Sequence, residues 1–275
     1  MSYRFALRPR WILSHLFVLA LVVTMVNLGL WQLRRLDERR DQNAVVSARL
    51  AEPPAPVGEL LDPDSGAADV ARVANRRVTV SGTYEPDQQV LVRSRSLDGS
   101  PGSWVLTPLR QADGSIVVVN RGWIGNDGTF DAVPASYTPA EGTVRVEGLL
   151  QESQEREGFG PTDPASGRLT SLARVDVERY ARQLDGPVQP GWVQLRAENP
   201  QPAAGADVPV PLDPPELDSG PHFSYAVQWF IFSTIAIVGY PLILRRNARE
   251  QSSAEDDTDE PIRPQDESVL ADGRA

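Results

Sequence analysis

The sequence contains no cysteine and no lysine, and only two of its 275 residues are histidine. Without thiols the chain has no disulfide, no thiolate metal site, no thiol nucleophile and no covalent attachment of a c-type haem. Its 27 basic residues are therefore all arginine, which we attribute to a GC-rich genome rather than to a mechanism. The net charge of −10 has the wrong sign for phosphate backbones, so we expect no nucleic-acid partner.

Two long runs without formal charge stand near the ends of the chain, at 11–30 (WILSHLFVLALVVTMVNLGL) and 223–244 (FSYAVQWFIFSTIAIVGYPLIL). At 1.5 Å per helical residue, about 20 residues cross the roughly 30 Å of a bilayer's hydrocarbon. The runs predict transmembrane helices over 11–33 and 222–244. A cleavable signal peptide is the alternative for the first run, but no Ala-x-Ala pattern follows its apolar core.

Arginines give the predicted spans a direction. Three arginines stand at 245–249, directly after the second run, whereas 197–222 contains none, which predicts a cytoplasmic C-terminus. Arginines flank the first run on both sides, so the first run does not indicate its own direction. With two spans and a cytoplasmic C-terminus, residues 1–10 are expected to be cytoplasmic as well. We expect a multi-pass protein of the bacterial cell membrane, in contact with lipid, whose residues 34–221 form an extracytoplasmic domain.

The middle of the chain alternates between apolar and polar residues in short β-branched runs bounded by Gly, Pro, Asp or Asn, which predicts strands. The pattern indicates a β-rich α+β domain built on an antiparallel sheet or a small barrel. One helix is expected at 175–184, with Asp176 as its N-cap. The predicted strands are 76–84, 88–95, 104–109, 115–124, 143–150 and 191–195.

The segments around this domain differ in composition. Residues 34–50 mix charges with spaced apolar positions and predict a continuation of the first helix, ending near Pro53-Pro54. Two segments, 52–71 and 197–220, are rich in Pro and Gly. This composition predicts loose connectors. The tail at 245–275 is predicted to be disordered and cytoplasmic; eight acidic residues against two arginines over 251–275 give −6 of the net charge.

His222 stands one residue before the second apolar run and is the only histidine outside the first. A neutral imidazole there could ligate a haem iron or another metal, or simply hydrogen-bond water and lipid head groups at a helix start. By residue type alone the second interpretation is the more common. His15 lies almost a membrane thickness away, so both histidines cannot ligate one iron, and a structural role is its default.

Side chains on the two predicted spans suggest how they meet. Asn27 and Gln228 lie at similar depth and could form an interhelical hydrogen bond, with Gly29 permitting close approach of the backbones. A stripe along the second span could receive a porphyrin or a partner helix, or could equally contact lipid or pack on the first span. The stripe consists of His222, Tyr225 or Ala226, Trp229, Ser233 and Ala236.

No catalytic constellation is present in the middle of the chain. It has no histidine between 34 and 221, no Gly-x-Ser-x-Gly, no phosphate loop, and its acids are not spaced as metal ligands. Residues 120–123 (NRGW) could form a site, but a strand end turned by glycine beside a buried tryptophan explains them equally well. We expect a protein that is not an enzyme.

Several motifs in order resemble the surfeit locus protein 1 (Shy-type) family of cytochrome c oxidase assembly factors. LGLWQLRR at 28–35 is similar to the family signature at the end of its first helix, and HFSYAVQWFIF at 222–232 is similar to the opening of its second. Between them, four strand motifs match in sequence order. These are RRVTVSGTY (76–84), TPL (107–109), VVVNRGWI (117–124) and VRVEGLL (144–150).

The resemblance implies an assembly factor for haem-copper oxidase that assists haem a delivery to, or stabilisation in, the catalytic subunit. It implies that His222 ligates the haem iron, with the remaining haem contacts coming from Tyr225, Trp229, Trp31, Gln32 and Arg35. The alternatives are an accessory subunit that stays bound to the oxidase supercomplex and handles no haem, and a sensor or secretion accessory protein. The proline-rich 197–220 and the acidic tail depart from the family pattern.

Overall fold

The computed structural model describes residues 4–125, 131–156, 158 and 160–258. The chain divides into two compact units: a helical unit of 1–42 and 218–275, and a sheet unit of 43–217. Two long helices form the first unit, and all the strands belong to the second.

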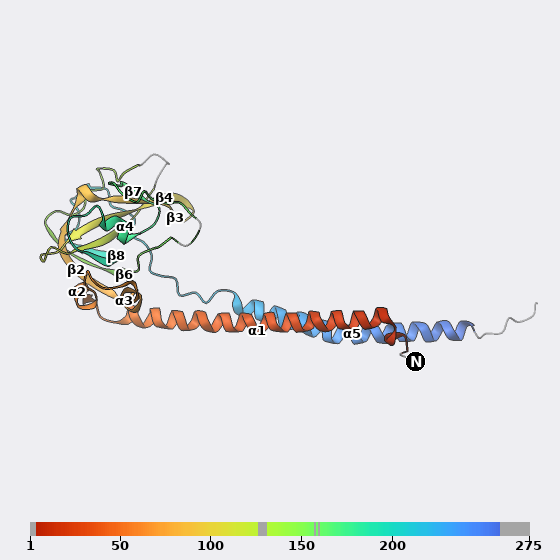
Figure 1. Cartoon of the computed structure of the whole chain (residues 1–275). Helices are drawn as coiled ribbons and strands as arrows, with labels where there is room; N and C mark the ends of the chain where they lie inside the picture. Colours follow the sequence, from red (N-terminus) through yellow and green to blue (C-terminus); the bar gives the residue numbers. More distant parts are fainter. Residues whose placement is uncertain (1–3, 126–130, 157, 159, 259–275) are drawn as a thin grey trace, which may run out of the picture. The chain divides into compact units, whose positions relative to one another are not determined.

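The helical unit is an antiparallel hairpin of α1 (Pro9–Ala51), preceded by the short η1 (Arg4–Leu7), and α5 (His222–Thr258) (Figure 1). Both helices are long and apolar enough to cross a membrane by length and composition. The helix expected over 11–33 is present and continues to Ala51, as the pattern at 34–50 predicts. Residues 245–258 are helical, which corrects the disordered tail predicted there, and 259–275 lie outside the described residues.

The two helices meet through small residues. Gly29 on α1 and Ala226 and Ser233 on α5 are buried, together with Met25 one turn before Gly29, while most of the larger apolar residues of the two apolar runs are exposed. A Cβ atom added at Gly29 would lie 2.9 Å from the ring of Phe230, so the aromatic ring packs directly on the glycine backbone. Only a residue without a side chain leaves room for that ring, so Gly29 accommodates an aromatic side chain rather than the backbone of the other helix, which corrects the close backbone approach expected there.

The predicted hydrogen bond between Asn27 and Gln228 is wrong. Asn27 Nδ2 donates to Val23 O at 2.7 Å, within its own helix, and both amide side chains are exposed. An asparagine can donate to the carbonyl one turn earlier in its own helix, which accepts this bond in addition to the backbone one, so equal depth does not bring the two amides together.

Gly29 can be tested against a glycine on the other helix. Gly29→Leu should drive the helices apart, because overpacking of this kind costs about 1–3 kcal/mol. Gly239→Leu is the matched control, since a Cβ there meets nothing within 4 Å. In a background with cysteines at positions 14 and 240, whose wild-type side chains touch across the hairpin, thiol cross-linking should fall for Gly29→Leu and not for the control. Equal yields would contradict this packing.

In the part of the sheet unit that the structure describes, eight strands form one sheet, ordered β1-β2-β6-β8-β5-β4-β3-β7, and there are four short helices. The strands are β1 (Ala55–Pro56), β2 (Arg77–Tyr84), β3 (Val90–Leu97), β4 (Ser100–Arg110), β5 (Ile116–Gly125), β6 (Thr143–Gln151), β7 (Ser171–Leu172) and β8 (Val188–Asn199). The helices are α2 (Val57–Leu60), α3 (Ala67–Val73), η2 (Pro86–Gln88) and α4 (Val177–Ala181). All six predicted strands are present, and so is the predicted helix, in which the Asp176 carboxylate accepts a hydrogen bond from Arg179 N at 2.8 Å.

The sheet is mixed, which corrects the purely antiparallel sheet predicted from the sequence. The small barrel predicted as its alternative is not contradicted, because β2 also pairs with β4, so that β2, β6, β8, β5 and β4 form a closed ring of paired strands. Three pairings are parallel: β1 with β2, β3 with β7, and β5 with β8. The central one, β5 with β8, arises because β8 is reached through a long connection that contains β7 and α4. Such a connection can return the chain in either direction, whereas the short links that predict antiparallel pairing cannot.

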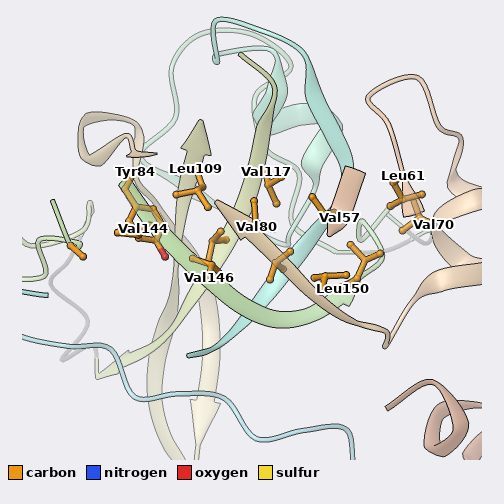
Figure 2. Close-up of a cluster of buried hydrophobic side chains, with 14 residues drawn as sticks. Val57, Leu61, Val70, Val80, Tyr84, Leu109, Val117, Val144, Val146 and Leu150 are labelled. Atoms are coloured by element: carbon orange, nitrogen blue, oxygen red, sulfur yellow. The ribbon is translucent and has the colours of Figure 1, made fainter. Parts of the chain in front are cut away.

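The predicted connector 52–71 is ordered. It contains β1, α2 and the start of α3, and its Val57, Leu61 and Val70 are buried at 3% exposure or less. Figure 2 shows these three side chains in the same cluster as Val80, Val117, Val146 and Leu150 from the strands. Widely spaced apolar residues carry no periodic signal, yet each enters the core.

The predicted connector 197–220 is also not loose throughout. β8 runs on to Asn199, and Val210 exchanges two backbone hydrogen bonds with Trp123 at 2.7 and 2.8 Å. Gln194 Nε2 donates to the carbonyls of Leu212 and Asp213. Prolines exclude regular hydrogen bonding along the segment, but the residues between them still pair with strand edges.

A buried polar cluster explains residues 120–123 structurally. Arg121 is 2% exposed and donates to Gln89 Oε1 at 3.0 Å and to Tyr137 O at 2.8 Å. Its guanidinium lies 5.9 Å from the centre of the Tyr84 ring, and the Tyr84 hydroxyl donates to Glu198 Oε2 at 2.9 Å. Burial, with the Glu198 charge second, raises the pKa of Tyr84 well above its usual value. The phenol therefore remains a neutral donor to the carboxylate.

Candidate functional site

One pair of predicted site residues is joined by a hydrogen bond. His222 begins α5, and its Nδ1 lies 2.8 Å from Oε1 of Gln32 on α1. Because a carbonyl oxygen only accepts, Nδ1 carries the ring proton and donates it. The lone pair is then on Nε2, the nitrogen that can bind a metal, and the partner on Nδ1 fixes the orientation of the ring. The packing of two distant helices thus selects one tautomer of His222.

Gly220 shapes the other edge of the His222 ring. It has a φ of +70°, and a Cβ added there would lie 3.4 Å from Cδ2 and 3.5 Å from Nε2 of His222. Glycine tolerates this left-handed conformation and keeps the Nε2 edge uncrowded. Sequence analysis missed Gly220, although a glycine two residues before the histidine in a proline-rich stretch was a signal for a special backbone turn.

The other four predicted site residues are not brought to His222 by any contact the structure describes. Trp31 and Tyr225 are 51% and 47% exposed. Arg35 pairs with Glu38 at 2.9 Å, one turn along its own helix. Trp229 packs edge-on against Phe232, with ring centroids 6.2 Å apart. Their role as haem contacts stays a prediction.

The stripe predicted on the second span follows the less exposed side of α5. Ala226 and Ser233 are 1% and 3% exposed, whereas Tyr225 is nearly half exposed. Between the two alternatives at that position, Ala226 therefore belongs to the stripe. Within the helical unit α1 covers the stripe. The stripe therefore packs on the first span of the same chain, which is one of the alternatives given by the sequence.

His15 has both ring nitrogens engaged. Nδ1 lies 2.7 Å from the hydroxyl of Tyr240, and Nε2 lies 3.2 Å from Ala6 O. Ser14 Oγ completes the contact, 3.0 Å from the same hydroxyl. This arrangement agrees with a structural role at the opposite end of the hairpin. Among the residues that the structure describes, no group of three or more His, Asp or Glu could hold a metal ion.

Comparison with known proteins places the chain in a family. The model described as the SURF1 family matches residues 19–234, most of the chain. The chain belongs to the SURF1 family. An uncharacterized SURF1-like protein of Mycobacterium tuberculosis is 31% identical over 246 residues, covering 86% of this chain and 83% of its own. A SURF1-like protein of Monosiga brevicollis is 26% identical over 257 residues (86% and 88%), and one of Rickettsia felis 23% over 238 residues (85% and 97%).

The SURF1 family match covers the whole sheet unit, α1 from residue 19 to its end, and α5 from its start to residue 234. It includes Gln32, Gly220 and His222, and it leaves out His15 and Tyr240. The resemblance found from motifs alone is therefore confirmed. The bonded His222–Gln32 pair lies within the part of the chain that the family shares, and the His15–Tyr240 pair lies outside it.

Proposed function

We propose that this SURF1 family chain is a membrane-bound assembly factor for haem-copper cytochrome c oxidase. It assists haem a delivery to, or stabilisation in, the catalytic subunit, and it acts without catalysing a reaction. The observation that carries the proposal is the His222–Gln32 bond at 2.8 Å, which leaves Nε2 of His222 with its lone pair. Family membership supports the oxidase as the partner.

The proposed location is the bacterial cell membrane, with both termini cytoplasmic and the sheet unit extracytoplasmic. The exposed apolar side chains of the hairpin support this placement, because in water they would be an aggregation surface and in lipid they are solvated. Phe17, Ile235 and Ile237, for example, are each more than half exposed. The arginines that follow position 244 support the orientation.

The residues at this end of the hairpin fit a haem as cargo. His222 Nε2 would supply one axial ligand, as neutral imidazoles commonly do for haem iron. Gln32, by accepting the proton on the other ring nitrogen, would hold the ring in the orientation that presents Nε2. The exposed rings of Trp31 and Tyr225 are apolar surface for a macrocycle, and Arg35 offers a cation for its carboxylates. A bound haem would contribute redox-active iron and a visible spectrum.

The test is the a-type haem signal of membranes. Reduced-minus-oxidised spectra of membranes from cells with and without this gene should show a severalfold lower a-type signal in the deletion strain, with the wild-type gene restoring it. The b-type and c-type signals of the same membranes are the internal control. An unchanged a-type signal and unchanged oxidase activity in the deletion strain would contradict the proposal and favour a role outside respiration.

A further inference from the structure

A small hollow in the sheet unit, about 200 Å³ in volume, is lined by four arginines. They are Arg156, Arg174, Arg179 and Arg182, and the side of Thr162 completes the lining with a hydroxyl group. Arg179 and Arg182 come from α4 and its C-cap, while Arg156 and Arg174 come from the segments before and after β7. Four guanidinium groups around so small a volume create a strongly positive local potential unless acids neutralise them.

Three acids also line the hollow, and each already has a partner. Asp163 pairs with Arg93 at 2.7 Å and accepts a hydrogen bond from the backbone of Ala173. Asp176 is the N-cap of α4. Glu178 pairs with Arg182 at 2.9 Å. Within the described part of the chain, the other three arginines of the hollow have no carboxylate partner.

Arg179 is the buried member of the set, at 5% exposure. Its Nε donates to Pro164 O at 2.5 Å and its Nη2 to Gly167 O at 2.9 Å. Its Nη1 is buried, and no described residue accepts a hydrogen bond from it. Carbonyl groups satisfy single donors but carry no net charge, so a buried guanidinium held only by carbonyls remains uncompensated.

Arg174 extends the positive region toward a second, larger polar hollow that it shares with Arg95. Arg174 Nη2 also donates to a carbonyl, that of Pro161, at 2.8 Å. Burial, with the charge of Arg174 second, lowers the pKa of Arg95. Glu152 and Glu155 line the larger hollow as well, so the smaller hollow is the one in which arginines outnumber acids.

We propose that the hollow lined by Arg156, Arg174, Arg179 and Arg182 binds a phosphate group, either free phosphate or the head group of a phosphate ester. Guanidinium groups present planar pairs of N–H donors that match the oxygens of phosphate, and several of them converge here. The volume is that of a small oxyanion site and is too small for a nucleotide. The site belongs to the sheet unit, whereas His222 belongs to the helical unit. The phosphate proposal therefore does not rest on the proposed haem binding.

The test uses the purified full chain in detergent, with inorganic phosphate as the first probe and dihexanoyl phosphatidic acid below its aggregation concentration as the second. Arg156→Gln with Arg182→Gln removes the two exposed arginines of the hollow and should leave the fold intact. The matched control is Arg72→Gln with Arg145→Gln. These arginines are also exposed and in the sheet unit, and Arg72 pairs with a carboxylate on its own helix just as Arg182 does.

At constant ionic strength, phosphate should raise the melting temperature of the wild type and of the control. Calorimetric titration should show roughly tenfold or more weaker binding to the Arg156/Arg182 variant, as expected for lost charge-assisted hydrogen bonds. If the lipid binds more tightly than free phosphate and loses affinity in the same variant, the natural ligand is a head group; the reverse order assigns free phosphate. No binding of either probe to the wild type, or equal binding to both double variants, would overturn the proposal.

Discussion

His222→Ala is expected to remove at least nine-tenths of the haem that co-purifies with the chain when it is expressed together with haem a synthesis. The alanine takes away Nε2, the ring nitrogen whose lone pair the hydrogen bond from Nδ1 to Gln32 leaves free. The measurement is the ratio of haem absorbance to protein in purified samples, with the reduced-minus-oxidised spectrum as confirmation. His15→Ala is the matched control, because both ring nitrogens of His15 are already engaged.

Variants of Gln32 distinguish a role in positioning the His222 ring from a role in filling space beside it. Gln32→Leu keeps the size of the side chain but frees Nδ1, and loss of such an outer partner typically weakens metal binding about 10–100-fold. Gln32→Glu keeps an acceptor oxygen and should retain haem. If His222→Ala left the haem spectrum unchanged, the ligand assignment would be wrong; if both Gln32 variants behaved alike, only the tautomer argument would fail.

Arg121→Met should destabilise the sheet unit by about 3–5 kcal/mol, the usual cost of leaving a buried charge without its counter-charge. The variant would leave Glu198, 8% exposed, without the charge of Arg121, and would remove a donor from the carbonyl of Tyr137; the amide oxygen of Gln89 keeps the Thr107 hydroxyl as its donor. Urea unfolding of the purified chain, followed by tryptophan fluorescence, measures the free energy of unfolding.

The control for that prediction is Arg77→Gln. Arg77 also forms a salt bridge, with Glu147 at 2.6 Å, but both side chains are about 40% exposed. A solvated pair contributes about 0–1 kcal/mol, so the loss should stay within that range. An Arg121→Met variant no less stable than Arg77→Gln would show that the buried cluster does not contribute to folding in this way.

Elements with a strong local signal could be predicted from the sequence. The 20-residue apolar run at 11–30 predicts its helix because its length and hydrophobicity alone are sufficient for a helix in lipid or in a bundle. Strands such as 143–150 alternate with the period of the pleat. Asp176 predicts the start of α4 because a carboxylate before a helix satisfies free backbone N–H groups.

Elements without a local signal could not be predicted from the sequence. Val57, Leu61 and Val70 are separated by polar and turn residues, and only the sheet they cover makes them core. The parallel pairing of β5 with β8 depends on where a long connection returns, which no pattern within either strand encodes. The hollow near Arg179 likewise gathers arginines from three separate segments of the sheet unit.

The candidate site shows the same division. By itself the sequence determined that His222 begins the second apolar helix and that Gln32 follows the end of the first apolar run by two residues, since helix limits follow from local composition. Only the tertiary structure decided that these two side chains bond to each other, whereas Asn27 bonds within its own helix. The physical reason is that depth along a helix follows from the number of residues, but the direction a side chain faces depends on the rotation at which the two helices pack, and here the ring of Phe230 packs on Gly29.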